Sequence, residues 1–197
     1  MNQAFSYTGR DNLDAMSYAV NYNNYIYSWL SRGLKEGDTI LDFGSGHGEF
    51  FNRFQIVNAN IEAVEPDLSM HRYYKNKTIH QSIDKVDNSF NLIYSVNVLE
   101  HIQDDDAIVK IFKDHLTDKK SSVKIFVPAR QELFSAMDKK VGHYRRYSKK
   151  QLEKLFVDNG YKIKTCRYFD SLGYFAAFIY KFVNKSGDIN KHGIKIY

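Results

Sequence analysis

The chain has 197 residues, of which 43% are hydrophobic and 26% are charged, a balance typical of a globular protein rather than a disordered or fibrous one. Its formal net charge is +5, and the single cysteine, Cys166, excludes an internal disulfide and favours a reducing, cytoplasmic location. We expect no signal peptide, because the N-terminus lacks a basic region followed by an apolar one. The longest apolar stretch, 172–180, is shorter than the roughly 20 residues of a membrane-spanning helix, although a peripheral membrane contact through 172–183 stays open.

Basic residues are concentrated in two places, 139–150 and the tail after 180. The first segment holds six basic residues and no acid. Such a patch can attract nucleic acid, anionic lipid or a phosphorylated substrate, or it can be an ordinary solvated surface. Charge alone leaves both interpretations open.

Apolar residues follow strand-like and helical patterns in alternation, which predicts a parallel sheet with helical crossovers. The predicted strands are 39–43, 61–65, 78–81, 90–96, 123–128 and 161–169. The predicted helices are 18–30, one that begins at 49, 69–74, 104–116, 148–160 and 171–183. Either 194–197 adds a seventh strand or the chain stops before one. The expected fold class is α/β, a Rossmann-like three-layer α/β/α sandwich with a mostly parallel sheet of six to seven strands in one domain.

Three alternating glycines follow the strand 39–43 and precede a helix, which is the first unit of a nucleotide-binding α/β fold. Glycine lets the backbone take positive φ and lets a ligand approach closely. A dinucleotide fingerprint G-x-G-x-x-G that starts at Gly44 would place its third glycine at position 49. Glu49 stands there instead, and its carboxylate would repel a pyrophosphate. The spacing therefore disfavours a nicotinamide-dependent oxidoreductase.

The second predicted strand ends in Glu65, where a carboxylate can accept hydrogen bonds from both ribose hydroxyls of a nucleoside. The pattern D-x-G-x-G-x-G at 42–48, together with Glu65, resembles the class I S-adenosylmethionine-dependent methyltransferases of small-molecule type. Val-Leu-Glu-His-Ile at 98–102 resembles a segment whose backbone lines the cofactor in that family. These motifs span roughly residues 39–127. The resemblance implies S-adenosylmethionine as cofactor and S-adenosylhomocysteine as product.

The resemblance also implies which residues contact the cofactor. The glycine turn would lie against the methionine part and Glu65 would hold the ribose. The pair Ser82 and Ile83 would contact the adenine, with Asp84 as the alternative. An N-terminal helical cap, 1–35, would cover the site above a core of 36–170 and a tail of 171–197, and Tyr22 is either a cofactor contact or an ordinary core residue. The expected cofactor-binding set is Asp42, Gly44, Ser45, Gly46, His47, Gly48, Glu65, Pro66, Ser82, Ile83, Asn97, Val98 and Tyr22.

Methyl transfer from a sulfonium requires in-line alignment of the acceptor, and an oxygen or nitrogen acceptor must also lose a proton. Because an unperturbed imidazole titrates near neutral pH, His101 and His143 are the candidate bases, and a structural role for His101 stays equally open. No metal site is predicted.

The basic segment contains Gly-His-x-Arg-Arg-Tyr at 142–147, which resembles a stretch in a methyltransferase subgroup often associated with glycan or lipid-linked substrates. Arginine offers forked donors for carboxylate or phosphate, and tyrosine offers a stacking face. The expected acceptor-binding residues are His143, Tyr144, Arg145, Arg146 and Tyr147. The alternative is structural: an arginine pairs with a helix acid, and Tyr147 packs ahead of a capping box at Ser148.

The sequence thus predicts an S-adenosylmethionine-dependent methyltransferase that acts on a small-molecule, saccharide or lipid-linked acceptor. The basic excess favours a nucleic-acid methyltransferase as the alternative. However, no Asn-Pro-Pro-Tyr-like or Asp-Pro-Pro-Tyr-like segment follows 90–96, and Cys166 does not follow a proline. A non-catalytic protein that binds S-adenosylmethionine is the remaining alternative.

Overall fold

The computed structural model describes residues 18–57, 60–74 and 78–169. They form two compact units, one of 18–96 with 114–125 and one of 97–113 with 126–169. None of the helices in these described ranges is long and apolar enough to cross a membrane. The first part of the predicted cap, 1–17, lies outside the described residues. So do the predicted helix and membrane contact within 171–183 and the predicted strand 194–197.

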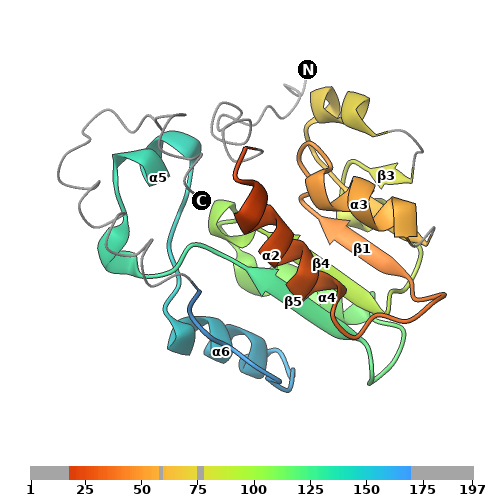
Figure 1. The fold of residues 1–197 in the computed structure, drawn as a ribbon. Helices are drawn as coiled ribbons and strands as arrows, with labels where there is room; N and C mark the ends of the chain where they lie inside the picture. Colours follow the sequence, from red (N-terminus) through yellow and green to blue (C-terminus); the bar gives the residue numbers. More distant parts are fainter. Residues whose placement is uncertain (1–17, 58–59, 75–77, 170–197) are drawn as a thin grey trace. The chain divides into compact units, whose positions relative to one another are not determined.

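The first unit is built on a five-stranded sheet with the strand order β3-β2-β1-β4-β5 (Figure 1). The strands are β1 (Ile40–Phe43), β2 (Ile61–Val64), β3 (Ile79–His80), β4 (Leu92–Val96) and β5 (Ser122–Phe126), the last of which ends at the boundary between the units. β1 pairs in parallel with β2 and with β4, and β2 pairs in parallel with β3. The predicted mostly parallel sheet is confirmed, and its register places Asp42 beside both Ala63 and Tyr94.

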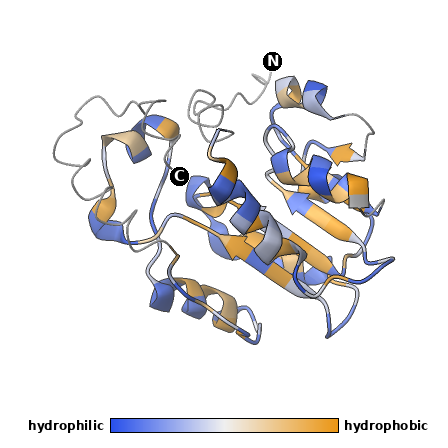
Figure 2. Cartoon of the chain, viewed as in Figure 1, coloured by the Kyte–Doolittle hydropathy of each residue, from blue (hydrophilic) through white to orange (hydrophobic). Residues whose placement is uncertain are grey.

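The central strands are buried on both faces. All four residues of β1 are buried, and Leu41 and Ile93 are fully inaccessible, as is Tyr94 on the opposite face. Because strands covered on both sides need apolar residues at nearly every position, β1 and β4 are apolar except at Asp42 and Ser95 and do not alternate with polar residues. Figure 2 shows this as mainly orange colouring along the central strands.

Two helices of the first unit, α2 (Val20–Ser31) and α3 (Glu49–Val57), lie on one face of the sheet (Figure 1). The Phe54 ring of α3 packs 4.9 Å from the Tyr27 ring of α2 and 5.4 Å from the Tyr94 ring of β4. Lys124 of β5 donates to carbonyl oxygens at the end of α2, at 2.7 Å to Leu30 and 2.8 Å to Arg32. A cation at this position also complements the negative end of the helix dipole.

The second unit contains the α-helices α4 (Asp105–Asp114, the last residue of which belongs to the first unit), α5 (Ala136–Val141) and α6 (Lys149–Asp158), and the short 3-10 helices η3 (Leu99–His101) and η4 (Gln131–Leu133). The 3-10 helices η1 (Leu68–Tyr73) and η2 (Ile83–Lys85) belong to the first unit. α6 begins at the predicted capping box, in which Ser148 N–H donates to Gln151 Oε1 at 2.9 Å and Gln151 N–H donates to Ser148 Oγ at 3.2 Å. α5 was not predicted. It is one short helix that begins with its own capping box between Ser135 and Asp138.

The strand predicted at 161–169 is wrong, and the sheet of the described residues has five strands rather than six or seven. Side-chain contacts hold residues 161–169 in place, instead of backbone hydrogen bonds to a neighbouring strand. The Tyr161 ring packs 5.2 Å from the Phe156 ring of α6, and the Arg130 guanidinium lies 4.1 Å from the centre of the Tyr168 ring. Alternating bulky residues are typical of a strand, but they do not specify a partner strand, and here their side chains find helices and loops.

Candidate functional site

The turn after β1 requires glycine at three positions. Gly44, Gly46 and Gly48 have φ of +79°, +53° and +74°, a region that L side chains rarely adopt. At Gly48 a Cβ atom would also lie 3.0 Å from Cε1 of Tyr74, so this glycine is needed for packing as well as for conformation. The predicted strand, glycine turn and helix are therefore confirmed as one local unit.

Tyr74 braces the glycine turn from the side. Its hydroxyl lies 2.8 Å from the carbonyl oxygen of Gly46, to which it donates, and 2.6 Å from Oγ of Ser45. A hydroxyl has one proton and two lone pairs, so the Tyr74 hydroxyl can donate to Gly46 and accept from the Ser45 hydroxyl. These two contacts fix the middle of the turn, where a bound ligand would approach the backbone.

Glu65 follows β2 and lies under the same turn. Its Oε2 accepts from Gly46 N–H and its Oε1 accepts from Asp67 N–H, each at 2.8 Å. The residue is only 6% exposed, and this burial raises the pKa of the carboxyl while the two backbone donors oppose the rise. A carboxylate offers about four acceptor sites. Two are used here, so the group retains capacity for two hydroxyl donors.

Asp42 is the second buried carboxyl of the first unit. It lies within β1, and its Oδ2 accepts from the Tyr94 hydroxyl at 2.7 Å. Burial raises the pKa of Asp42 to about 8 against the effect of this hydrogen bond, so the carboxyl is largely protonated at neutral pH. Asp42 therefore ties β1 to β4 within the sheet.

The structure gives each of the other predicted cofactor residues of the first unit a clear location. His47, in the turn, packs 4.4 Å from the ring of Tyr73. Ser82 hydrogen-bonds Asp84 at the start of η2. The remaining three differ in exposure: Ile83 is buried, Tyr22 on α2 is half-buried, and Pro66 is exposed.

In the second unit, Asn97 and Val98 come directly after β4. Asn97 has φ of +55° and donates its N–H to the Phe126 carbonyl at 2.8 Å. Asparagine tolerates this left-handed conformation better than most residues. A strained backbone at the end of a strand is a common feature of ligand sites, but it does not by itself identify one.

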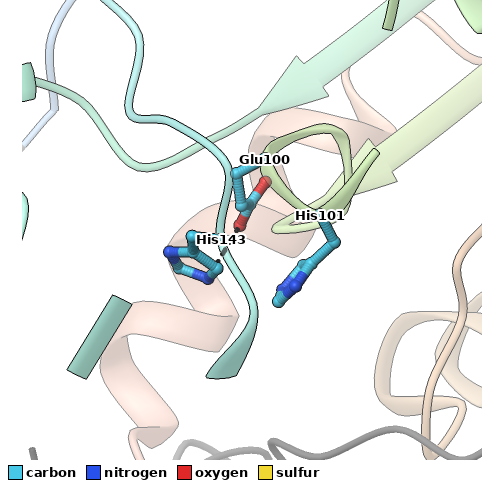
Figure 3. A group of neighbouring side chains, drawn as sticks. All are labelled: Glu100, His101 and His143. Atoms are coloured by element: carbon cyan, nitrogen blue, oxygen red, sulfur yellow. Dashed lines mark ion pairs between the residues drawn. The ribbon is translucent and has the colours of Figure 1, made fainter. Parts of the chain in front are cut away.

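Three side chains that could bind a metal meet in the second unit: Glu100 and His101 from η3, and His143 from the loop after α5 (Figure 3). One ligand atom of each lies within 4.8 Å of the others. His143 Nε2 is 3.9 Å from Glu100 Oε1, and the two imidazole rings lie edge to face with centres 4.5 Å apart. Both candidate bases are therefore brought together, with a carboxyl group beside them.

Asp138 and Arg146 fix the orientation of His143. His143 Nδ1 donates to Asp138 Oδ1 at 2.8 Å, and Arg146 donates to both Asp138 oxygens, at 2.8 and 3.0 Å. Burial alone would raise the pKa of Asp138, but the hydrogen bonds from His143 and Arg146 and the charge of Arg146 hold it well below its usual range. Asp138 is thus ionised and can only accept, so the neutral form of His143 carries its proton on Nδ1 and its lone pair on Nε2.

Burial shifts the other two members of the cluster toward their neutral forms. It raises the pKa of Glu100 to about 8, with a further rise from the charge of Asp138, while the residue's own backbone N–H and the charge of Arg146 oppose the rise. It lowers the pKa of His101 to about 4, with the charge of His143 acting in the same direction. At neutral pH His101 is uncharged, and Glu100 holds its proton unless a cation compensates the negative charge.

The remaining residues of the predicted acceptor segment are mostly engaged within the second unit. Arg145 pairs with Asp105 at 2.6 Å and keeps 29% of its side chain exposed. The Tyr147 hydroxyl donates to the same carboxylate at 2.7 Å, and Tyr147 is buried. Tyr144 is 54% exposed. Arg145, Arg146 and Tyr147 thus have the contacts expected of a structural role, while the largely exposed Tyr144 ring has the Arg145 guanidinium 5.9 Å from its centre.

Comparison with known proteins decides the family. A family model described as a methyltransferase domain matches residues 18–165. The chain belongs to this methyltransferase family. No significant match is found among curated protein sequences.

Solved structures show the methyltransferase fold at low sequence identity. Magnesium protoporphyrin IX methyltransferase of Synechocystis PCC 6803, with bound SAH, has TM-score 0.59 and 16% identity over 84% of this chain and 82% of its own. A chain in the complex of the Haloferax volcanii Trm112 methyltransferase activator with a candidate methyltransferase has TM-score 0.60 and 16% identity, with 78% and 72% covered. Haemonchus contortus phosphoethanolamine N-methyltransferase 2, in complex with S-adenosyl-L-methionine, has TM-score 0.58 and 17% identity, with 71% and 36% covered.

Sequence reasoning missed three residues that shape these two groups of side chains. Tyr74 was counted only as part of a short helix, and Glu100 only as part of a backbone segment. Asp138 had one available signal, because Ser-x-x-Asp at 135–138 is a possible capping box. Nothing local marks Tyr74 or Glu100, whose roles depend on contacts with distant parts of the chain.

Proposed function

We propose that this methyltransferase-family chain transfers a methyl group from S-adenosylmethionine to a small-molecule, saccharide or lipid-linked acceptor. The observation that carries the proposal is the geometry of Glu65. Its carboxylate is buried at the end of β2, held by Gly46 and Asp67 N–H groups, and retains acceptor sites for two hydroxyls. A ribose presents two adjacent hydroxyls, so the residues fit the nucleoside part of this cofactor. The family match and the two solved structures that hold the cofactor or its product support the assignment.

The first unit would supply the cofactor contacts. When bound, S-adenosylmethionine provides a methyl group on a positively charged sulfur. The glycine turn, with Ser45 and His47, would lie along the methionine part, because its positive-φ backbone leaves room for close approach. Pro66, next to Glu65, would border the ribose.

Other expected contacts complete the cofactor site. Ser82 and Ile83, or Asp84, would contact the adenine, and Asn97 and Val98 would line the site after β4. Tyr22 on α2 would cover the cofactor as part of a cap. Asp42 would contribute by holding β1 to β4 beneath the turn, since its carboxyl is bonded to Tyr94.

The second unit would serve the acceptor. An oxygen or nitrogen acceptor must lose a proton as it takes the methyl group, and His101 and His143 would act on that proton. His143 is the better oriented of the two, because Asp138 fixes its ring as the aspartate does in a Ser-His-Asp triad. Tyr144 and Arg145 would contact the acceptor, by a stacking face and by the guanidinium N–H groups that remain beside those bonded to Asp105 and to the Gln103 carbonyl. Arg146 and Tyr147 would hold the segment in place.

In the direct test, the purified chain is incubated with methyl-labelled S-adenosylmethionine and, separately, with three groups of acceptors: saccharides, phospholipid headgroups and RNA or DNA oligonucleotides. We expect label in one of the first two groups, and none with the Glu65→Gln variant. Label only in the oligonucleotides would favour the nucleic-acid alternative. Cofactor binding without transfer to any group would favour a non-catalytic role.

A further inference from the structure

The Glu100 carboxyl is buried in the second unit without a partner at hydrogen-bond geometry among the described residues. Its side chain has 0% exposure, and among the described residues neither carboxylate oxygen has a hydrogen-bond partner. A buried carboxyl without hydrogen bonds is costly and calls for a specific explanation, such as an ion. His143 Nε2 lies 3.9 Å from Glu100 Oε1, a distance too long for a hydrogen bond.

The two histidines beside Glu100 are oriented as metal ligands usually are. His143 donates its Nδ1–H to Asp138 in a hydrogen bond, so the lone pair on Nε2 is on the side of Glu100. His101 is hydrogen-bonded to the backbone at Val141 and Gly142, which fixes its ring. A ligating histidine almost always donates its other ring N–H to a carboxylate or a backbone carbonyl, because this sets the tautomer and the ring orientation.

We infer that Glu100, His101 and His143 form a binding site for a divalent first-row cation, with Zn²⁺ as the expected occupant. Two imidazole nitrogens and one carboxylate oxygen are a typical ligand set for such ions, and three protein ligands leave a coordination position open. A tetrahedral ion with bonds of about 2.1 Å separates its ligands by about 3.4 Å. The ligand atoms lie within 4.8 Å of one another, so small side-chain rotations would close the site.

The cation would explain why a carboxylate and two imidazoles are gathered in a buried position. Its charge would compensate Glu100, and Asp138 with Arg146 would form the surrounding shell that keeps His143 in place. The consequence for catalysis rests on the proposed function: a divalent cation lowers the pKa of a hydroxyl bound at its open position. An oxygen acceptor would then release its proton to solvent more readily, and the two histidines would hold the ion instead of accepting the proton themselves.

The test uses the full chain, purified without a histidine tag and stripped with a chelator. Zn²⁺ binding is measured by competition with a chromogenic chelator, and Co²⁺ binding by the visible absorption of the bound ion. The variants are Glu100→Gln and His143→Gln, with the matched control Glu153→Gln on α6, where the carboxylate pairs with Lys149. Circular dichroism spectra establish that each variant is folded.

We expect one ion per chain, an affinity reduced at least about tenfold in both cluster variants, and no change in the control. Wild-type protein that binds no stoichiometric ion would overturn the inference, as would folded cluster variants that bind as tightly as wild type. If a cluster variant does not fold, the Asp138→Asn variant gives a second measure, with about 10- to 100-fold weaker binding expected. Calorimetric binding of S-adenosylmethionine by the same samples separates the two proposals, because loss of either kind of binding leaves the other measurable.

Discussion

The buried carboxyl of Asp42 makes the stability of the fold depend on pH. Its pKa is raised from 3.8 to about 8, so the folded chain holds a proton there that the unfolded chain releases above its lower pKa. The free energy of unfolding should therefore fall as pH rises between these values and level off above about 8. At 1.36 kcal/mol per unit, the full shift corresponds to roughly 6 kcal/mol. Asp42→Asn removes this titration but keeps an oxygen that can accept from Tyr94.

Urea unfolding of wild type and Asp42→Asn at about pH 5 and about pH 8.5 isolates the effect, because all other titrating groups are common to both proteins. We expect the variant to gain at least about 2 kcal/mol on wild type between the two pH values. Equal pH dependence of the two proteins would refute the reasoning. It would show that Asp42 ionises in the folded sheet at little cost.

Three further substitutions test local features of the fold. Gly48→Ala should destabilise the chain by about 1–3 kcal/mol more than Gly33→Ala in urea unfolding. Both glycines have positive φ, but only at Gly48 would a Cβ atom press against Tyr74. Equal losses of unfolding free energy in the two variants would contradict this. Lys124→Met should cost roughly 1–3 kcal/mol, since it removes a charged donor from the end of α2, and an unchanged urea midpoint would count against it. Ser148→Ala should cost about 1 kcal/mol by loss of the α6 capping box, whereas a neutral effect on thermal unfolding would show that the box adds nothing.

The parts of the fold that could be predicted from the sequence have local causes. The strand, glycine turn and helix from β1 to α3 follow from an apolar run, three residues that need positive φ, and helical spacing. The capping box at Ser148 is likewise contained within four residues. The position of Glu65 beside the glycine turn could be predicted, because the strand order places the end of β2 beside the end of β1.

The failures come from contacts between distant segments. A strand was predicted at 161–169 because the pattern there suits one, yet Tyr161 and Tyr168 pack on other elements of the second unit. Glu100 was assigned no role, since the sequence does not reveal that it is fully buried or that His143 reaches it. Pattern reasoning describes what a segment can form, and tertiary packing decides which partner it finds.

The central claim is that the glycine turn and Glu65 bind S-adenosylmethionine. Calorimetric titration of the purified chain with S-adenosylmethionine and with NAD tests it directly, on wild type, on Glu65→Gln and on the exposed control Glu36→Gln. We predict binding of S-adenosylmethionine alone, weakened at least about tenfold in the Glu65 variant and unchanged in the control, because the variant loses a charged acceptor for the ribose hydroxyls. Absence of binding by wild type, or equal binding by the folded Glu65→Gln variant, would contradict the claim.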